Sequence, residues 1–451
     1  MHAGDGPEGS VTEPVPAPAT ARPRTLTLRG ATVLGIGSMI GAGIFALLGE
    51  AGVVAGAAVW ISFLIGGVVA LLIGYVCAKL GMTYPSSGGL ITYLIKGFGL
   101  GRLVGIASWL GYIAAIVIVT AMVAVSFGGY ASALFVGENA SSYWNNLFIT
   151  GVLLVMLVVN LVGTNVVAAA QSVIVFCVLG AFVVFLGATL PNINTSLLAF
   201  SGYPSVTKIV ASVALTFFAY LGFNVITFTG GDIRDPEKNI PRATYLAIGI
   251  TAVTYVAIAV GVFGTLTVAE VIKYGETAIA EAARPQLGDA GFKIMAVVAL
   301  LSTAGATNAT LYASGNLTNM LAEQRLFPPL FGSRSRFGRN GGLILTTAFV
   351  LMVANFVDLS SIASVGSAVS LLVFLLVGVA GWRRRANTGS NRIIVLLAIA
   401  VIAVVLGFFA VDTVRNDPWS FVAIIAISLA SIALDAVFGR RNGVETSARS
   451  S

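Results

Sequence analysis

The sequence predicts an all-α polytopic membrane protein with 12 transmembrane helices. Hydrophobic residues make up 57% of the 451-residue chain, and charged residues only 10%. A water-soluble domain carries roughly 25% charged residues, because its surface has to be solvated. Disorder is excluded as well, since disordered chains have low hydrophobicity. Twelve apolar runs, separated by segments rich in Pro, Gly and charge, are the expected membrane-crossing helices.

The runs divide the chain into five regions. Residues 1–27 are rich in Pro, Ala and Gly, with no apolar core of the kind a signal peptide needs, so a disordered cytoplasmic tail is expected. Charge is nearly absent inside the runs, which favours helices over the alternating strands of a lipid-facing β-barrel. Five runs are expected at 28–190, five at 205–385 and two at 391–438, followed by a second cytoplasmic tail at 439–451.

Basic residues are concentrated in every second loop. With the N-terminus in the cytoplasm, the inner segments hold 20 of the 25 Lys and Arg residues. The positive-inside rule then predicts that both termini lie in the cytoplasm, and the expected location is the cell membrane. The net charge of +7 therefore reflects topology and contact with anionic lipid, and nucleic acid is not an expected partner. The outer segments hold Lys208, Lys273, Arg284, Lys293 and Arg415.

Residues that carry enzyme chemistry are scarce. The single histidine, His2, lies in the N-terminal tail, and Cys77 and Cys177 lie in apolar runs, where small core residues are expected. There is no zinc-ligand spacing and no pair of acids in the middle of a run. We therefore expect neither an enzyme nor a resident cofactor.

The first run contains an unusual concentration of glycine. The segment GIGSMIGAGIF, residues 35–45, has four glycines, each of which weakens a helix by roughly 1 kcal/mol relative to Ala. One interpretation is a close-packing face, since Gly37 and Gly41 have the four-residue spacing used between membrane helices. The other is a helix broken at Ser38–Ala42, whose freed backbone groups line a cavity. Its second half would then favour an anion at its N-terminus.

Four segments in order resemble the amino acid–polyamine–organocation (APC) superfamily of transporters. IGSMIGAGIF at 36–45 is similar to the first-helix signature of that family. YPSSGGLITYLIKGFG at 84–99 resembles the loop between its second and third helices. FFAYLGFNVITFTGGDIRDPEKNIPRA at 217–243 resembles its sixth helix and the following loop, and LYASGNLTNMLAEQRLFPPLF at 311–331 is a looser match. The resemblance extends from about residue 28 to residue 440.

The resemblance implies the LeuT fold, a 5+5 inverted repeat followed here by two C-terminal helices. Helices one and six of that fold correspond to each other and are both broken at the middle of the membrane. The second break is expected at Ala219–Gly222. The implied function is secondary active transport of amino acids by alternating access, with a small-molecule substrate and the lipid bilayer as partners.

The resemblance also implies the substrate site. Backbone N–H groups after the first break would hold the substrate carboxylate, and carbonyl groups at the two breaks would receive its amine. Phe218 falls where the family commonly places an aromatic gate over the substrate; the alternative, less favoured, is a packing or lipid-facing side chain. The implied substrate-binding residues are Met39, Ile40, Ala42, Gly43, Ile44, Phe218, Ala219, Leu221, Gly222 and Asn224.

Departures from the family pattern indicate the kind of substrate. Asn224 stands where some exchangers of cationic substrates have a carboxylate, and Gly230 and Gly231 replace a common acidic pair. A cationic side chain inside a membrane is expected to need an acidic partner. The sequence therefore favours amino acids with neutral side chains over arginine, lysine and polyamines.

The sequence leaves three possibilities for the coupling of transport: Na⁺, H⁺, or exchange without a coupling ion. The fifth helix lacks the lysine of some proton-coupled relatives. Carbonyl and hydroxyl oxygens are suitable ligands for a hard cation such as Na⁺. The alternative is that Ser and Thr hydroxyls in a helix simply bond the backbone carbonyl one turn back. The resemblance implies a candidate sodium site formed by Gly37, Ile40, Ala299, Ser302 and Thr303.

Other functions of the same fold stay open. The alternatives are transport of a small amine or another organocation, and a nutrient sensor that does not transport. A channel is disfavoured, because no repeated filter motif is present. An ion pair between Arg29 and Asp232, Asp235 or Glu323 could close the inner mouth, or these charges are simply solvated. The sequence predicts no oligomeric state.

Overall fold

The helices follow the predicted apolar runs in order. The computed structural model describes residues 25–86, 88–137, 139–162, 167–332 and 338–439, and contains no β-strand within them. The all-helical prediction is confirmed. The two predicted tails lie almost entirely outside the described residues. The α-helices are α1 Leu28–Ala42, α2 Ile44–Ala55, α3 Val59–Thr83, α4 Gly89–Phe98, α5 Arg102–Tyr112, α6 Val119–Phe135, α7 Ser142–Val162, α8 Val167–Thr189, α9 Val206–Ala219, α10 Asn224–Phe228, α11 Pro236–Phe263, α12 Val268–Tyr274, α13 Ala278–Glu281, α14 Arg284–Glu323, α15 Gly341–Phe356, α16 Leu359–Arg383, α17 Arg385–Thr388, α18 Arg392–Asn416 and α19 Pro418–Gly439.

Ten helical segments of the described chain are long and apolar enough to cross a membrane. Two of the twelve predicted runs depend on shorter helices, Leu28–Gly41 and Gly341–Phe356. The second has 16 residues and extends about 24 Å, less than the roughly 30 Å of a hydrocarbon core. One helix was not expected, since α4 occupies the segment predicted as a loop between helices two and three. Of the two cysteines, Cys77 is buried as expected, but Cys177 is exposed on α8.

The first helix is interrupted at a single residue. Gly43, with φ −104° and ψ −78°, separates α1 from α2 and lies one residue beyond the expected break at Ser38–Ala42. The interruption is tight, because the Gly43 N–H still donates to the Met39 carbonyl at 2.7 Å. The predicted break at Ser38–Ala42 is wrong in position and extent: these five residues are helical, and the interruption is confined to Gly43, whose backbone groups stay bonded.

The second interruption falls within the predicted interval Ala219–Gly222. Helix α9 ends at Ala219, Tyr220 forms a turn, and the 3₁₀ segment η6 (Leu221–Phe223) leads into α10. The Tyr220 hydroxyl donates to the Phe63 carbonyl of α3 at 2.9 Å. This bond between two helices anchors the turn.

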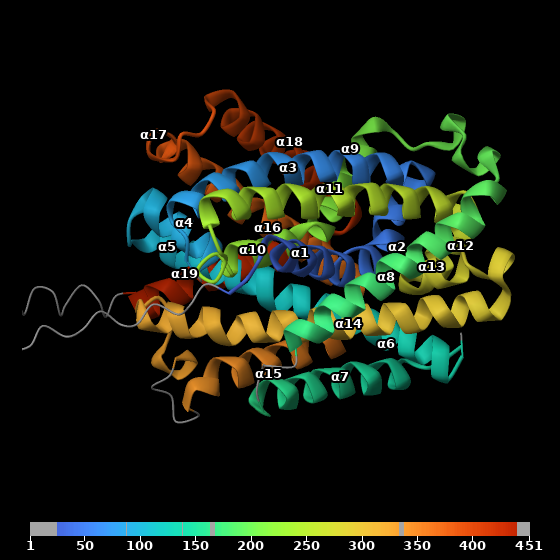
Figure 1. Ribbon diagram of the computed structural model, residues 1–451, viewed down its shortest axis with the longest axis horizontal. Coiled ribbons are helices and arrows are strands. Elements are labelled where there is room, and N and C mark those ends of the chain that lie inside the picture. Colours follow the sequence, from blue (N-terminus) through green and yellow to red (C-terminus); the bar gives the residue numbers. More distant parts are fainter. Residues whose placement is uncertain (1–24, 87, 138, 163–166, 333–337, 440–451) are drawn as a thin grey trace, which may run out of the picture.

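Both interruptions lie in the middle of the bundle. Figure 1 shows α1 at the centre, with α3 and α11 on one side of it and α14 and α6 on the other. Helix α1 packs against α11, α14 and η6, and α2 packs against α9. Almost all of α1 and α9 near the interruptions is buried, so their backbone groups face protein and not lipid.

The segment before α1 is joined to the loop after α10 by the backbone. Leu26 and Ile233 form a parallel β-bridge, in which the Leu26 N–H donates to the Asp232 carbonyl and the Arg234 N–H donates to the Leu26 carbonyl, both at 2.9 Å. The ion pair that the sequence allows for Arg29 would lie in this region. The contact that joins the two segments is formed by peptide groups.

A side-chain bond between α3 and α9 provides a test of the packing. The buried Thr216 hydroxyl donates to the Ser62 carbonyl at 2.7 Å. Thr216→Val keeps the shape and removes this bond, so the free energy of unfolding should fall by about 1 kcal/mol. The melting temperature of the purified protein measures the change. Thr254→Val is the matched control, because its exposed hydroxyl bonds only its own helix, at Ile250; equal melting temperatures of the two variants would contradict the assignment.

Candidate functional site

One tyrosine joins the two interrupted helices. The Tyr255 hydroxyl of α11 donates to the Met39 carbonyl of α1 at 2.6 Å and lies 3.2 Å from the Ala219 carbonyl of α9. The Ile44 N–H at the start of α2 bonds to the same hydroxyl. Tyr255 is fully buried and packs edge-on against Phe63 with ring centroids 5.4 Å apart. A single hydroxyl therefore contacts backbone groups on both sides of the first interruption and at the second.

Two glycines allow the interruptions to approach each other. A Cβ atom on Gly222 would overlap the backbone of Ser38 and Met39, and one on Gly43 would overlap the Tyr255 hydroxyl and the Ala219 carbonyl. Any larger residue at either position would have to separate α1 from the second interruption. The glycines expected from the broken-helix interpretation thus permit contact between two backbones as well as the break itself.

A small cavity lies beside this contact. The space open to water-sized molecules is about 30 Å³, enough for one or two waters but not for an amino acid. The arrangement is therefore closed around the site. The cavity is lined by Ser38, Ala115, Ile116, Val119, Met122, Phe218, Leu221, Gly222, Asn224, Val225, Phe228, Thr310 and Ala313.

A second, smaller cavity of about 10 Å³ shares four lining residues with the first, namely Ala115, Leu221, Asn224 and Phe228. Asn224 is 4% exposed, and its side-chain oxygen has no hydrogen-bond partner among the described residues. The Ser370 hydroxyl of α16, which lines the second cavity, is also buried without a partner. None of the described residues that line either cavity carries a charge. The region thus presents unsatisfied neutral polar groups in an apolar wall.

The structure brings the residues expected from the sequence to one place, but in two groups. Phe218, Leu221, Gly222 and Asn224 line the first cavity. The residues Met39, Ile40, Gly43, Ile44 and Ala219 are buried in the contact between the interruptions. Ala42 ends α1, and its side chain is outside the description.

Phe218 also packs against α16, beyond the cavity. A Cβ atom on Gly366 of α16 would come within 2.5 Å of its ring and 2.6 Å of Ile118. The ring is 2% exposed. Phe218 therefore fills the space between the cavity wall and α16, a position that fits both the gate and the packing interpretation.

The residues of the candidate sodium site lie where α1 packs against α14. A Cβ atom on Gly41 would come within 2.5 Å of the Ser302 carbonyl, which shows how closely the two helices approach. The Thr303 hydroxyl donates to the Ala299 carbonyl at 2.7 Å. Two of the expected ligands are thus bonded to each other. The described residues contain no group of three or more His, Cys, Asp or Glu side chains that could hold a metal.

Sequence reasoning missed two features of the site. Tyr255 gave no signal, because it is one of 12 tyrosines and lies in an ordinary apolar run. Between α5 and α6 the third predicted helix contains a π-helical segment, η2 (Ile113–Ile118), and two of its residues, Ala115 and Ile116, line the first cavity. Such segments are frequent at functional sites, but nothing in the residues IAAIVI distinguishes them from α-helix.

Comparison with known proteins identifies the family. The family model described as "Amino acid permease" matches residues 26–435. The inner membrane transport protein YbaT of Escherichia coli is 31% identical over 93% of this chain and 98% of its own length. The methylthioribose transporter of Bacillus subtilis is 26% identical over 79% of this chain and 80% of its own. The serine/threonine exchanger SteT of Bacillus subtilis is 27% identical over 66% and 68%.

The Tyr255 contact makes a specific prediction. Tyr255→Phe leaves the ring and removes the donor to the Met39 carbonyl, so the free energy of unfolding should fall by about 1–3 kcal/mol. Thermal unfolding of the purified variant measures this fall. Tyr312→Phe is the matched control, because Tyr312 is 46% exposed on α14. A Tyr255→Phe variant as stable as this control would show that the bridge contributes nothing.

Proposed function

The chain belongs to the amino acid permease family, and on that premise we propose that it is a secondary active transporter. Its substrates are amino acids with neutral side chains, which it moves across the cytoplasmic membrane by alternating access. The observation that carries the proposal is Asn224, which lines two uncharged cavities beside the interrupted helices and whose buried side-chain oxygen has no hydrogen-bond partner among the described residues.

The chemistry of these cavities selects against charged side chains. A buried carbonyl oxygen without a partner costs about 1–3 kcal/mol, which a hydroxyl or amine of a ligand would recover. A cationic side chain would instead remain uncompensated, since no acid lines the cavities. Serine and threonine, named in one relative's activity, carry a hydroxyl of suitable size.

We propose the LeuT fold with 12 spans, in which the two shorter helices α1 and α15 are counted in addition to the ten long segments. Interruptions in the first and sixth predicted helices support a pair of inverted repeats, because the two positions correspond in that fold. The carboxylate of the substrate would bind N–H groups at Ala42, Gly43 and Ile44, and its amine would bind carbonyls at Met39, Ile40 and Ala219. In the closed arrangement the Gly43 N–H donates to the Met39 carbonyl. This bond has to break before the Gly43 N–H can bind the substrate carboxylate.

Contacts between loops support the proposed orientation. Segments predicted on the inner side meet at the end of the bundle that holds α4 and α17, where Arg384 donates to the Lys96 carbonyl at 2.5 Å. Two basic residues predicted on the outer side, Lys208 and Arg415, line one groove between α9 and α18. The pairing of loops that share a predicted side supports cytoplasmic termini.

Uptake into proteoliposomes tests the substrate class. We expect faster initial uptake of labelled serine, threonine or alanine than of lysine or putrescine, because the cavities hold no fixed anion. Methylthioribose belongs in the same panel, since a relative is named for its transport. Faster uptake of lysine or putrescine would overturn the proposal, and empty liposomes are the control.

Asn224→Asp in the same assay tests the residue that carries the proposal. A carboxylate at this position should lower uptake of neutral substrates at least about 10-fold, equivalent to about 1.4 kcal/mol, and raise the relative uptake of lysine. Asn355→Asp is the control, because Asn355 is on α15 and lines neither cavity.

Replacing sodium with choline tests the candidate sodium site. The Thr303 hydroxyl is bonded to the Ala299 carbonyl, so an ion would have to displace this bond. We therefore expect uptake to continue unchanged in choline. Loss of uptake in choline, reproduced in sodium by Thr303→Val, would instead establish sodium coupling at this site.

A further inference from the structure

A short helical loop covers the end of the bundle opposite α4 and α17. It consists of α12, the 3₁₀ segment η7 (Gly275–Thr277) and α13, and Figure 1 shows α12 and α13 beyond the end of α2. The loop packs directly on α2 and α6. The approach is close, since a Cβ atom on Gly49 of α2 would lie 2.7 Å from the Gly275 carbonyl. In the proposed orientation this is the outer face, and α2 is the half-helix that follows the first interruption.

The loop places one carboxyl group against the bundle and near another. Glu276 is partly exposed as a residue, but its carboxyl points inward, and a Cβ atom on Gly129 of α6 would overlap it. Glu50, in the middle of α2 and next to Gly49, accepts a hydrogen bond from Ser360 and lies in electrostatic range of Glu276 and Asp358. Two carboxyl groups on opposite sides of the loop contact thus repel each other when both are ionised.

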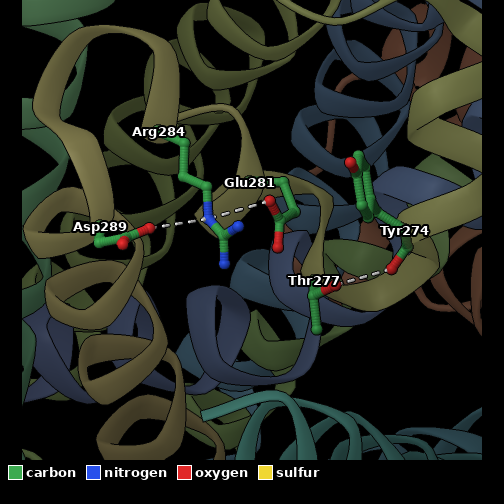
Figure 2. A network of polar contacts seen from close by, with 5 residues as sticks. All are labelled: Tyr274, Thr277, Glu281, Arg284 and Asp289. Carbon is green, nitrogen blue, oxygen red and sulfur yellow. Dashed lines mark hydrogen bonds and ion pairs between the residues drawn. The ribbon is translucent and has the colours of Figure 1, made fainter. Parts of the chain in front are cut away.

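The cations of this region are engaged elsewhere. Figure 2 shows Arg284 between two acids, with its Nε 3.3 Å from the buried Glu281 and 3.7 Å from Asp289. The same guanidinium lies 4.4 Å from the centroid of the Phe292 ring. On α12, the Lys273 ammonium lies 5.1 Å from the centroid of the Tyr274 ring. The ion pairs shown in this loop therefore neutralise Glu281 and Asp289, and not the Glu50–Glu276 pair.

A buried hydroxyl points to the same place. Tyr130 of α6 is fully buried, and its hydroxyl has no hydrogen-bond partner among the described residues. It lies in electrostatic range of Glu276 and Glu281, and its ring packs edge-on against Phe45 of α2 with centroids 5.7 Å apart. Buried hydroxyls are almost always bonded, so this unused group beside the carboxyls indicates a site that is completed by a ligand or a proton.

We propose that Glu50 and Glu276, with the Tyr130 hydroxyl, form a proton-binding site whose occupation holds the outer loop closed on α2. When one proton is bound, one carboxyl is neutral and the repulsion between η7 and α2 is removed. When the proton leaves to the outer solution, the two carboxylates push the loop away from α2. The effect on transport rests on the proposed function, whereas proton binding itself does not.

The electrostatics of the loop agree in direction. Burial raises the pKa of the Glu276 carboxyl above its usual value, so the neutral form persists to higher pH than in an exposed glutamate. The apparent values belong to the pair and not to one residue. The titratable and charged groups that face the pair are Tyr130 on α6, Glu270, Lys273 and Tyr274 on α12, Glu281 on α13, Arg284 and Asp289 on α14, and Asp358 before α16.

Thermal unfolding against pH is the first test. A carboxyl with a raised pKa stabilises the folded protein below its unfolded pKa, and this stability is lost as pH rises through the folded pKa. The melting temperature should therefore fall by about 1–3 °C between about pH 5 and about pH 8. Glu276→Gln and Glu50→Gln should each reduce this fall, and the double variant should abolish it. If one single variant does not fold, the reduced fall of the melting temperature in the other still tests the proposal.

Glu270→Gln is the matched control. Glu270 is exposed, and hydrogen bonds from Thr267 lower its pKa, so its own titration lies below the tested interval. The melting temperature of this control should fall with pH as much as that of the wild-type protein. An equal fall in the wild-type protein, the control and the double variant would overturn the proposal.

Uptake against external pH is the second test. With the internal pH fixed, initial uptake by the wild-type protein should change at least about 2-fold over the same interval, and the double variant should lose this change. A protein that transports nothing in the panel but keeps the pH-dependent melting would overturn the proposed function and support the proton site. Uptake by the double variant with the wild-type pH profile would overturn the link to transport.

Discussion

The structure depends on a contact between two interrupted backbones in the middle of an apolar bundle. Peptide groups released from a helix inside a membrane have no water to bond, so they must find partners within the protein. Here the partner is the hydroxyl of Tyr255, which meets backbone groups of Met39, Ile44 and Ala219. Gly43 leaves room for this hydroxyl, and Gly222 lets the second interruption touch the backbone of Ser38 and Met39, so two helices distant in sequence meet at one point.

The same requirement explains the polarity of the cavities. Asn224 and Ser370 keep unbonded oxygen atoms beside cavities that no charged side chain of the described residues lines, which is costly unless a ligand supplies the missing hydrogen bonds. The loop formed by α12, η7 and α13 repeats this arrangement with carboxyl groups, and there the buried Tyr130 hydroxyl is the group without a partner among the described residues. In both places an unsatisfied polar residue lies beside one half of the first interrupted helix: Asn224 shares a cavity with Ser38 of α1, and Tyr130 packs against Phe45 of α2.

Much of the helical architecture was predictable from sequence, because spans depend on apolar length and on the absence of charge. The two interruptions were predictable in position within a residue or two, since glycine clusters and a family resemblance mark them. The site was only partly predictable. Phe218, Leu221, Gly222 and Asn224 do line a cavity, but Tyr255 and the π-helical Ala115 and Ile116 come from unremarkable apolar runs. Their roles depend on which helices become neighbours.

By itself, the sequence determined that the chain lies in a membrane, where its helices run and which helix is weakened by a cluster of glycines. Those properties follow from composition and local propensity, which act along the chain. Only the tertiary structure decided that the Gly43 N–H is bonded, that Thr303 bonds Ala299, and that Glu276 faces the bundle near Glu50. Such facts depend on contacts between residues far apart in sequence. Close packing, and not local pattern, selects those contacts.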